Sequence, residues 1–280
     1  MEYRTLRNGV KIPVIGFGVF QIPAAQTKQA VLSALRAGYK LIDTARAYGN
    51  EREVGEAIRE SGIPREEIFV TTKLWLSDFS YDGAIQATQT SLERLGVDTI
   101  DLMLLHQPMG DYQSAWKALE KLYKDGALRA IGMANCYPHV LADLCETFEI
   151  APMVNQVEIH PFFQQERNME VMKEYGVIPE AWAPFNEGKR DFFRNPVLTE
   201  IGQKYGKTAA QVALRWNIQR GAVVIPKSVH EERIRQNFDV FDFALTEDDM
   251  AKIKTMDLGH SEIVDHFDPQ WVKFLHSLKV

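Results

Sequence analysis

The sequence has few cysteines and no long apolar run. Only two of its 280 residues are cysteines, Cys136 and Cys145, which is too few for a disulfide framework, so we expect a reducing, cytoplasmic compartment. The first residues, MEYRTLRNG, are charged and contain no apolar h-region, and no run approaches the ~20 apolar residues of a membrane-spanning helix. These absences argue against secretion and against a membrane partner.

The chain also lacks an excess of positive charge and any metal-binding pair of histidines. Its 32 basic and 38 acidic residues give a net charge of -6, which argues against nucleic acid as a partner. The seven histidines form no HxH or HExxH pair, so we expect no metal ion. A local basic pocket is still compatible with this overall charge.

Short apolar runs alternate along the chain with helical segments. Helix starts are indicated by Asn50 before EREVGEAIRE, which Gly62 follows, and by the capping boxes at Thr208 and Thr246. Eight such runs indicate parallel strands that close into a barrel. The runs are VIGFG, KLIDT, IFVTTKL, IDLMLLH, LRAIGMAN, MVNQVEIH, VIPEAWAP and AVVIP.

A small hairpin is predicted ahead of these runs, because Asn8-Gly9 between TLR and VKIPV is typical of a two-residue type I′ turn. No linker or low-complexity tract interrupts the alternation. We therefore expect one α/β domain, residues 1–280, with a (β/α)8 TIM-barrel fold and a short N-terminal β-hairpin.

Four polar residues follow the ends of successive apolar runs: Asp43, Tyr48, Lys73 and His106. Thirty residues separate Asp43 from Lys73, and 33 separate Lys73 from His106, close to the ~31 residues of one strand-helix unit in a barrel. The carboxyl ends of barrel strands share one face, where the active site lies. We therefore expect these side chains to meet in one pocket, although each alone could be a cap or a hydrogen-bonded core residue.

The four side chains suit the protonation of an oxygen that gains negative charge. A free tyrosine has a pKa of ~10, so a catalytic Tyr48 needs its phenolate stabilised. A cation ~4 Å away contributes about 4 kcal/mol at an effective dielectric of ~20, enough to lower a pKa by about two units. Lys73 could be that cation, provided that Asp43 keeps it charged against the effect of burial. His106 could orient the substrate oxygen, whereas His160, which has no matching acid or cysteine, is interpreted as structural.

Signatures of other dehydrogenases are absent. The GFGVFQ stretch from Gly16 lacks the third glycine of a dinucleotide fingerprint and the acid ~20 residues later. No tyrosine is followed four residues later by a lysine, and two cysteines cannot build a zinc alcohol dehydrogenase. A different barrel chemistry is therefore indicated.

The succession of several stretches resembles the aldo-keto reductases over nearly the whole chain. They are GFGVFQ, LIDTARAYGNE, VTTKLW, DLMLLHQP, VNQVEIHP, YGKTAAQVALRW and IPKSV. The ending MDLGHSEIVDHFDPQWVKFL is most similar to the microbial branch with diketogluconate reductase-like and methylglyoxal reductase-like enzymes. The resemblance implies a barrel that binds a nicotinamide cofactor, with Tyr48 as proton donor, Lys73 and Asp43 tuning it, and His106 positioning the carbonyl.

The resemblance also implies a set of cofactor residues. Asn135 and Gln156 fall where the family bonds the nicotinamide carboxamide, and Trp182 where it stacks a ring. Ala134 and Gln236 depart from the family's usual serine and glutamate. The adenosine end and its 2′-phosphate would be held after the last strand, which implies NADPH. The full set is Asn135, Gln156, Trp182, Ala183, Phe185, Lys227, Ser228, Val229, Arg233, Gln236 and Asn237.

Phe20 and Trp75 resemble aromatic walls of the substrate mouth, beside Tyr48 and His106. For each of these residues a plain structural role, such as rim packing or a solvated helix start, is the alternative. The segment NEGKRDFFRN could fold over the cofactor or be a solvated connection.

The function expected is NADPH-dependent reduction of aldehydes or activated ketones by a monomer whose partner is a small-molecule carbonyl substrate. A cofactor-binding redox sensor or partner subunit without turnover is the alternative, and a phosphate-binding barrel enzyme such as an isomerase is a third.

Overall fold

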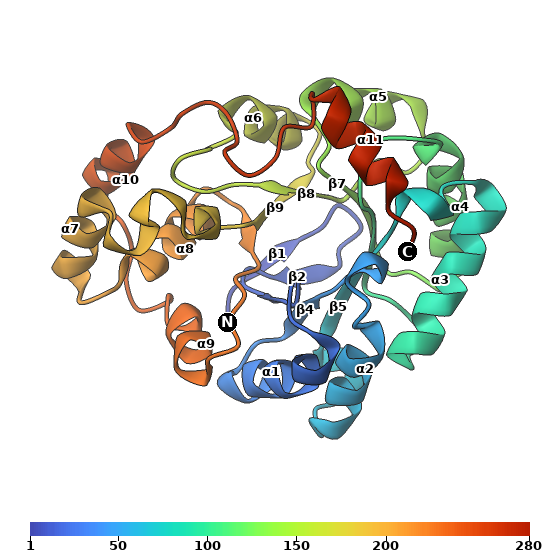
Figure 1. Ribbon diagram of the computed structural model, residues 1–280, viewed down its shortest axis with the longest axis horizontal. Coiled ribbons are helices and arrows are strands. Elements are labelled where there is room, and N and C mark those ends of the chain that lie inside the picture. Colours follow the sequence, from blue (N-terminus) through green and yellow to red (C-terminus); the bar gives the residue numbers. More distant parts are fainter.

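Eight parallel strands form a ring at the centre of the computed structural model, which describes residues 1–280 (Figure 1). Neighbouring strands in the ring follow chain order. The ring closes between its first and last strands, where Ile15 bridges Val224 and the Gly16 amide donates to the Val224 carbonyl at 2.8 Å. The predicted barrel is confirmed. Its strands are β3 (Phe17–Gly18), β4 (Leu41–Asp43), β5 (Phe69–Leu74), β6 (Leu102–Leu105), β7 (Ile131–Ala134), β8 (Val154–Glu158), β9 (Ile178–Trp182) and β10 (Val223–Val224).

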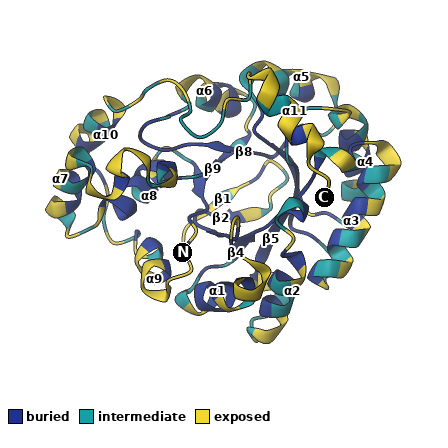
Figure 2. Ribbon diagram, viewed as in Figure 1, coloured by how far each residue is buried: buried dark blue, intermediate teal, exposed yellow.

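Helices surround the ring and cover its outer surface (Figure 2). Their inward stripes are buried and their outer faces exposed, because each helix packs against the sheet on one side and meets water on the other. The α-helices are α1 (Ala24–Ala37), α2 (Glu51–Glu60), α3 (Tyr81–Leu95), α4 (Tyr112–Lys124), α5 (Pro138–Thr147), α6 (Glu166–Glu174), α7 (Pro196–Tyr205), α8 (Ala209–Gln219), α9 (Glu231–Phe238), α10 (Glu247–Lys254) and α11 (Pro269–Ser277). Short 3-10 segments are η1 (Arg46–Tyr48), η2 (Arg65–Glu67), η3 (Leu76–Asp78) and η4 (Asn186–Arg194). No helix is both long enough and apolar enough to cross a membrane.

The predicted helix starts differ in how they are made. Thr208 and Thr246 form capping boxes, as predicted, and begin α8 and α10. Asn50 precedes α2 but makes no side-chain cap. Its side-chain oxygen instead accepts a hydrogen bond from the Thr44 hydroxyl at 2.8 Å, and its side-chain nitrogen donates to the carbonyl of Val19 at 3.2 Å. It thus ties the loop after β4 to the loop after β3.

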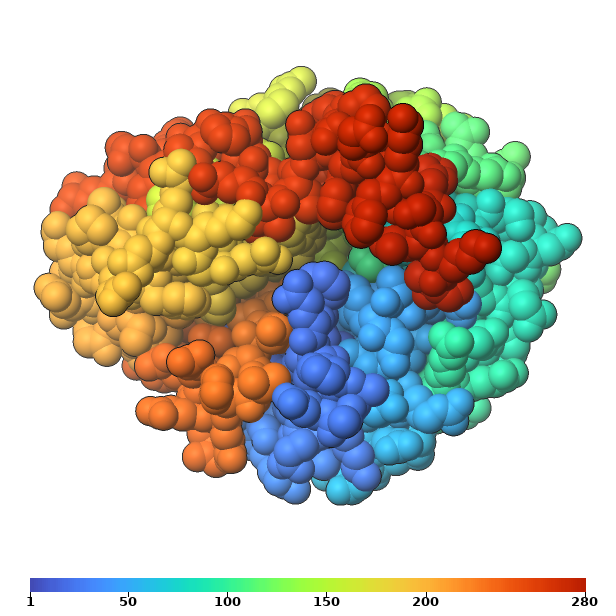
Figure 3. All heavy atoms as spheres, viewed as in Figure 1, coloured from blue at the N-terminus to red at the C-terminus, as the bar shows by residue number.

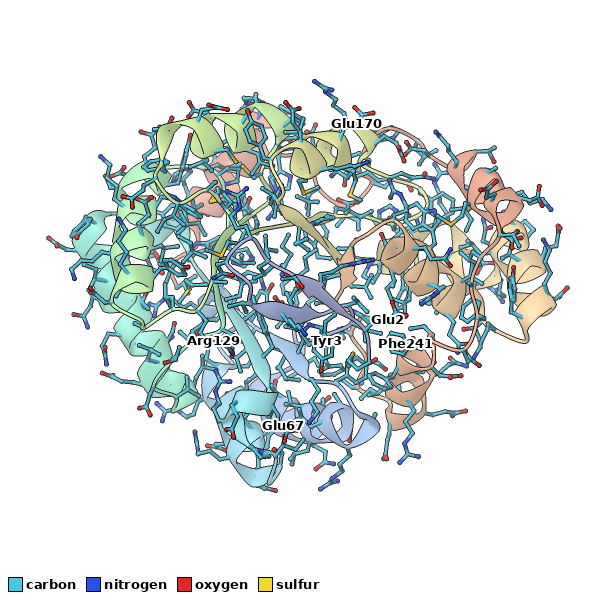
Figure 4. The ribbon with its side chains drawn as sticks, turned by 180° about the vertical axis from the view of Figure 1, so that it is seen from behind. Glu2, Tyr3, Glu67, Arg129, Glu170 and Phe241 are labelled. Atoms are coloured by element: carbon cyan, nitrogen blue, oxygen red, sulfur yellow. The ribbon has the colours of Figure 1, made fainter.

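The N-terminal hairpin is present, but the predicted turn is wrong. β1 (Tyr3–Thr5) pairs with β2 (Lys11–Pro13), and the turn closes with the Gly9 amide donating to the Leu6 carbonyl at 2.8 Å. Gly9 has φ +85°, whereas Asn8 is not in the left-handed region, so the loop is a type I turn followed by a glycine bulge and not a two-residue type I′ turn. Figure 4, seen from behind, shows the hairpin across the centre of the ring, with Tyr3 labelled, so it covers the amino-terminal end of the barrel.

Candidate active site

Three side chains meet at the carboxyl end of β4 and β5. Asp43 ends β4, Tyr48 ends η1 four residues after Thr44, and Lys73 lies near the end of β5. The Lys73 ammonium donates to Asp43 Oδ1 at 2.6 Å, to the Thr44 carbonyl at 2.9 Å and to the Tyr48 hydroxyl at 3.3 Å. Lys73 is 0% and Asp43 2% exposed, so the ion pair lies out of water, where charges interact most strongly.

Lys73 remains an ammonium in this environment. Burial by itself lowers the pKa of Lys73, but the charge of Asp43 and the neighbouring Tyr48 oxygen outweigh burial and raise it above its ordinary value. The role expected for Asp43, which was to keep the lysine charged, agrees with this direction.

Tyr48 departs from the expectation of a lowered pKa. Burial raises the pKa of Tyr48 and outweighs the opposing effect of Lys73. Lys73 does lower the pKa of Tyr48 as expected, but in the free protein this effect is smaller than that of burial. A phenol that keeps its proton is suited to donating it only when a stronger base forms beside it.

His106 completes the cluster as a neutral ring. It follows β6, and its ring centroid lies 5.7 Å from that of Tyr48 and 5.0 Å from that of Trp75. Burial and the charge of Lys73 lower the pKa of His106 well below its ordinary value. A neutral imidazole has one N–H to donate, and Nδ1 of His106 is buried without a hydrogen-bond partner.

The two aromatic residues predicted at the mouth differ in exposure. Phe20 is 50% exposed, and its ring lies 5.0 Å from that of Tyr48. Trp75 is only 4% exposed, because its indole nitrogen donates to the carbonyl of Leu278 at 3.2 Å. Figure 3 shows the C-terminal segment, in red, lying across the face of the barrel near the blue N-terminal third. This segment covers Trp75.

The amides predicted to hold the nicotinamide lie beside the cluster. Asn135, at φ +57°, donates to the His106 carbonyl at 3.0 Å and accepts the indole N–H of Trp182 at 2.9 Å. The amide nitrogen of Gln156 donates to Asp43 Oδ2 at 2.8 Å and to Glu180 Oε2 at 3.1 Å. Oε1 of Gln156 accepts no hydrogen bond from the protein, so it is the part of this amide that is available to a ligand.

Two further predicted residues follow Trp182. Ala183 has φ +46°, an uncommon conformation for a residue with a side chain. The ring of Phe185 lies 5.8 Å from that of Phe192 and 5.7 Å from that of Phe193. It therefore packs against two rings of η4.

The residues predicted for the adenosine end lie in the loop after β10 and within α9. Lys227 and Arg233 are exposed and have no ion pair, whereas Arg235 of the same helix pairs with Glu231 at 2.5 Å. Ser228 is buried and its hydroxyl accepts the amide of His230 at 3.1 Å. Val229 and Gln236 are exposed, and Asn237 is buried. Two unpaired cations beside a hydroxyl fit a phosphate group.

The segment NEGKRDFFRN, which contains η4, is tied to the C-terminal segment. Glu262 accepts hydrogen bonds from Asn186 Nδ2 at 3.2 Å and Arg190 Nε at 2.7 Å, and its carbonyl accepts from Lys189. The segment is thus an anchored loop over β9, with Asn186 and Arg190 at positive φ.

Two buried acids with defined partners, Glu158 and Glu180, were not predicted from the sequence. Glu158 accepts from Nε2 of His160 at 2.8 Å and from Ser261 at 2.6 Å. His160 therefore has an acid partner, and the premise that no acid matches it is wrong. Glu180 is fully buried in β9 beside Gln156. Its signal was an acid inside the apolar run VIPEAWAP.

A separate groove lies away from this cluster, beneath the hairpin at the other end of the barrel. It measures about 630 Å³ and is lined by residues that include Tyr3, Glu67 and Arg129, which Figure 4 labels. Of its three basic side chains, Lys40 and Arg129 are already paired with Glu67 and Asp101, and Lys11 has no ion pair. None of the predicted site residues lines it.

Comparisons with known proteins agree with the geometry. The model of the "Aldo/keto reductase family" matches residues 14–257. The chain is 47% identical over 253 residues to the glyoxal reductase of Bacillus subtilis, covering 90% of this chain and 91% of that protein, and 45% identical over 268 residues to the morphine 6-dehydrogenase of Pseudomonas putida, covering 91% and 90%. Among solved structures, a Bombyx mori aldo-keto reductase in complex with NADP superposes with a TM-score of 0.90 at 33% identity, covering 95% of each chain.

Proposed function

We propose the function of this site from one premise: the chain belongs to the aldo/keto reductase family. It is an NADPH-dependent oxidoreductase that reduces carbonyl groups of small molecules. The assignment of roles rests on one observation. The buried Lys73 ammonium forms an ion pair with Asp43 and also donates a hydrogen bond to the Tyr48 hydroxyl.

NADPH, when bound, supplies the hydride that reaches the carbonyl carbon. Tyr48 gives its hydroxyl proton to the carbonyl oxygen as that oxygen becomes an alkoxide, and the ammonium of Lys73 stabilises the phenolate that remains. Asp43 holds that ammonium in place. His106, as a neutral imidazole, donates its N–H to the same oxygen and orients it.

The chain also offers a consistent binding surface for the cofactor. Asn135 and Gln156 would hold the carboxamide, and the half-buried ring of Trp182 would stack on the nicotinamide. Lys227 and Arg233 would receive the 2′-phosphate, because both cations lack an acidic partner.

We further place the chain in the microbial branch of diketogluconate reductase-like and methylglyoxal reductase-like enzymes, with reactive aldehydes such as glyoxal as substrates. Its support is the C-terminal stretch from Met256 and the likeness to glyoxal reductase. A monomer in the cytoplasm, with no nucleic-acid partner, is proposed from the net charge of -6 and the free Cys136 and Cys145.

The test is turnover by the purified chain, with glyoxal, methylglyoxal and simpler aldehydes, followed by NADPH absorbance. Tyr48→Phe removes one hydroxyl and should lower kcat by about two to four orders of magnitude, the range for a positioned acid, while NADPH binding is unchanged. A Tyr48→Phe variant that retains most of the turnover would contradict the role of Tyr48. Binding of NADPH without turnover of any aldehyde would favour a sensor over an enzyme.

A further inference from the structure

Glu180 is the one fully buried carboxyl that touches the active-site cluster without a role in the proposed reaction. It lies in β9, between Gln156 of β8 and Val223 of β10 in register, with 0% exposure. Its Oε2 accepts the amide nitrogen of Gln156 at 3.1 Å, and its Oε1 is buried without a partner.

Gln156 connects this carboxyl to the catalytic ion pair. The same amide nitrogen donates to Asp43 Oδ2 at 2.8 Å, while Asp43 Oδ1 holds Lys73 at 2.6 Å. The two hydrogens of one amide group thus join two carboxyl groups. Because both acceptors face its nitrogen, Gln156 is held with Oε1 turned away from them.

We infer that Glu180 is a positioning residue that acts through Gln156, and that it does so as a neutral carboxylic acid. The inference rests on the proposed function and deepens it. Glu180 and Asp43 together fix the orientation of the Gln156 amide. Because a neutral Glu180 carries no negative charge, it does not compete with Asp43 and Tyr48 for the ammonium of Lys73.

The charges around Glu180 favour this neutral form. The titratable groups near it are Asp43 from β4, Lys73 from β5 and Tyr48 from η1, and its neighbour on β10 is the apolar Val223. One buried cation cannot neutralise two carboxylates, and the second carries the cost of burial. Burial first, and then the charge of Asp43, raise the pKa of Glu180 to about 8.

Ionisation of Glu180 opposes proton transfer from Tyr48. A negative charge at Glu180 disfavours the phenolate that forms when Tyr48 gives up its proton. We therefore expect kcat for carbonyl reduction, at saturating NADPH, to fall as pH rises through about 8. Glu180→Gln has the shape of the neutral acid and cannot ionise, so its kcat should stay high across this range.

The experiment compares wild type, Glu180→Gln and a matched control, Glu158→Gln. Glu158 is also a buried carboxyl on a barrel strand, but its bonds go to His160 and Ser261. Between pH 7 and pH 9, kcat should fall by about tenfold in wild type and in the control, because about a tenth of a group with a pKa near 8 keeps its proton at pH 9. In Glu180→Gln it should change less than about twofold over this range.

A second readout needs no turnover. The infrared spectrum of the free protein at pH 7 should show the C=O stretch of a neutral carboxylic acid, shifted in D2O, in wild type and Glu158→Gln but not in Glu180→Gln. Thermal unfolding checks that each variant is folded.

The outcomes separate the two proposals. If the wild type is active and Glu180→Gln shows the same pH dependence of kcat and the same infrared band, the role of Glu180 is contradicted, while the proposed reductase function is not. A wild type that reduces no aldehyde would overturn the proposed function, and the infrared band would then still decide whether Glu180 is the neutral acid.

Discussion

Replacing Lys73 with methionine should cost more stability than any single surface change, because it leaves a buried carboxylate without its cation. Asp43 is 2% exposed, and Lys73 at 2.6 Å is its only cationic partner. Breaking a buried pair from one side costs about 3–5 kcal/mol. At roughly 2–3 °C per kcal/mol for a chain of this size, the midpoint of thermal unfolding should fall by roughly 6–15 °C.

The assay is urea and thermal unfolding by circular dichroism, with two comparisons. The double variant Lys73→Met/Asp43→Asn removes both charges and should recover most of the loss, since no buried charge remains unpaired. Lys40→Met breaks the pair with Glu67, whose side chains are 26% and 55% exposed, and should cost less than about 1 kcal/mol. A Lys73→Met protein as stable as Lys40→Met would refute the reasoning that the Asp43 charge depends on Lys73.

Three further predictions follow from the same structure. Lys227→Ala should weaken NADPH binding by roughly tenfold or more and leave NADH binding nearly unchanged, whereas Arg235→Ala, whose cation is already paired, should change neither dissociation constant measured by tryptophan fluorescence. Thr208→Ala should lower the free energy of unfolding by about 1 kcal/mol, because it removes the capping hydroxyl of α8. Because the pKa of Lys73 is raised on folding, its contribution to stability is complete below the unfolded pKa of ~10.4 and is lost as pH rises through the higher folded value. The free energy of unfolding of wild type, compared with that of Lys73→Met/Asp43→Asn, should therefore fall only above about pH 10. An equal fall at pH 8 would contradict this prediction.

The barrel could be predicted because its signals are local and repeated. The run IDLMLLH contains β6, whose four residues LMLL are all buried, and strands buried on both sides require continuous apolar character. The convergence of Asp43 with Lys73 also follows from local signals, since neighbouring parallel strands place their carboxyl ends side by side.

What could not be predicted depends on contacts between distant segments. Asn50 has the sequence pattern of a helix cap, but its amide finds better partners in Thr44 and Val19, 6 and 31 residues away. The burial of Trp75 depends on the Leu278 carbonyl, 203 residues away. No local pattern specifies either partner.

The direction of the Tyr48 pKa shows the same limit in energetic terms. A charge at an assumed distance could be estimated from the sequence, but the opposing cost of burial depends on how completely the loops exclude water. Glu180 is visible as an acid inside the run VIPEAWAP, but its connection to Asp43 through the amide of Gln156 depends on a contact between three strands that no local pattern specifies.

The three bonds of Lys73 have a consequence for the chemical durability of the enzyme. A free amine beside an aldehyde condenses with it to an imine, and that reaction requires the nitrogen lone pair. In Lys73 the lone pair carries a proton that Asp43 retains, and the three N–H groups point at Asp43, the Thr44 carbonyl and Tyr48. The amine that the reaction requires is therefore protected from the electrophiles that the enzyme handles, so adduct formation by glyoxal should fall on exposed lysines such as Lys227 and leave Lys73 unmodified.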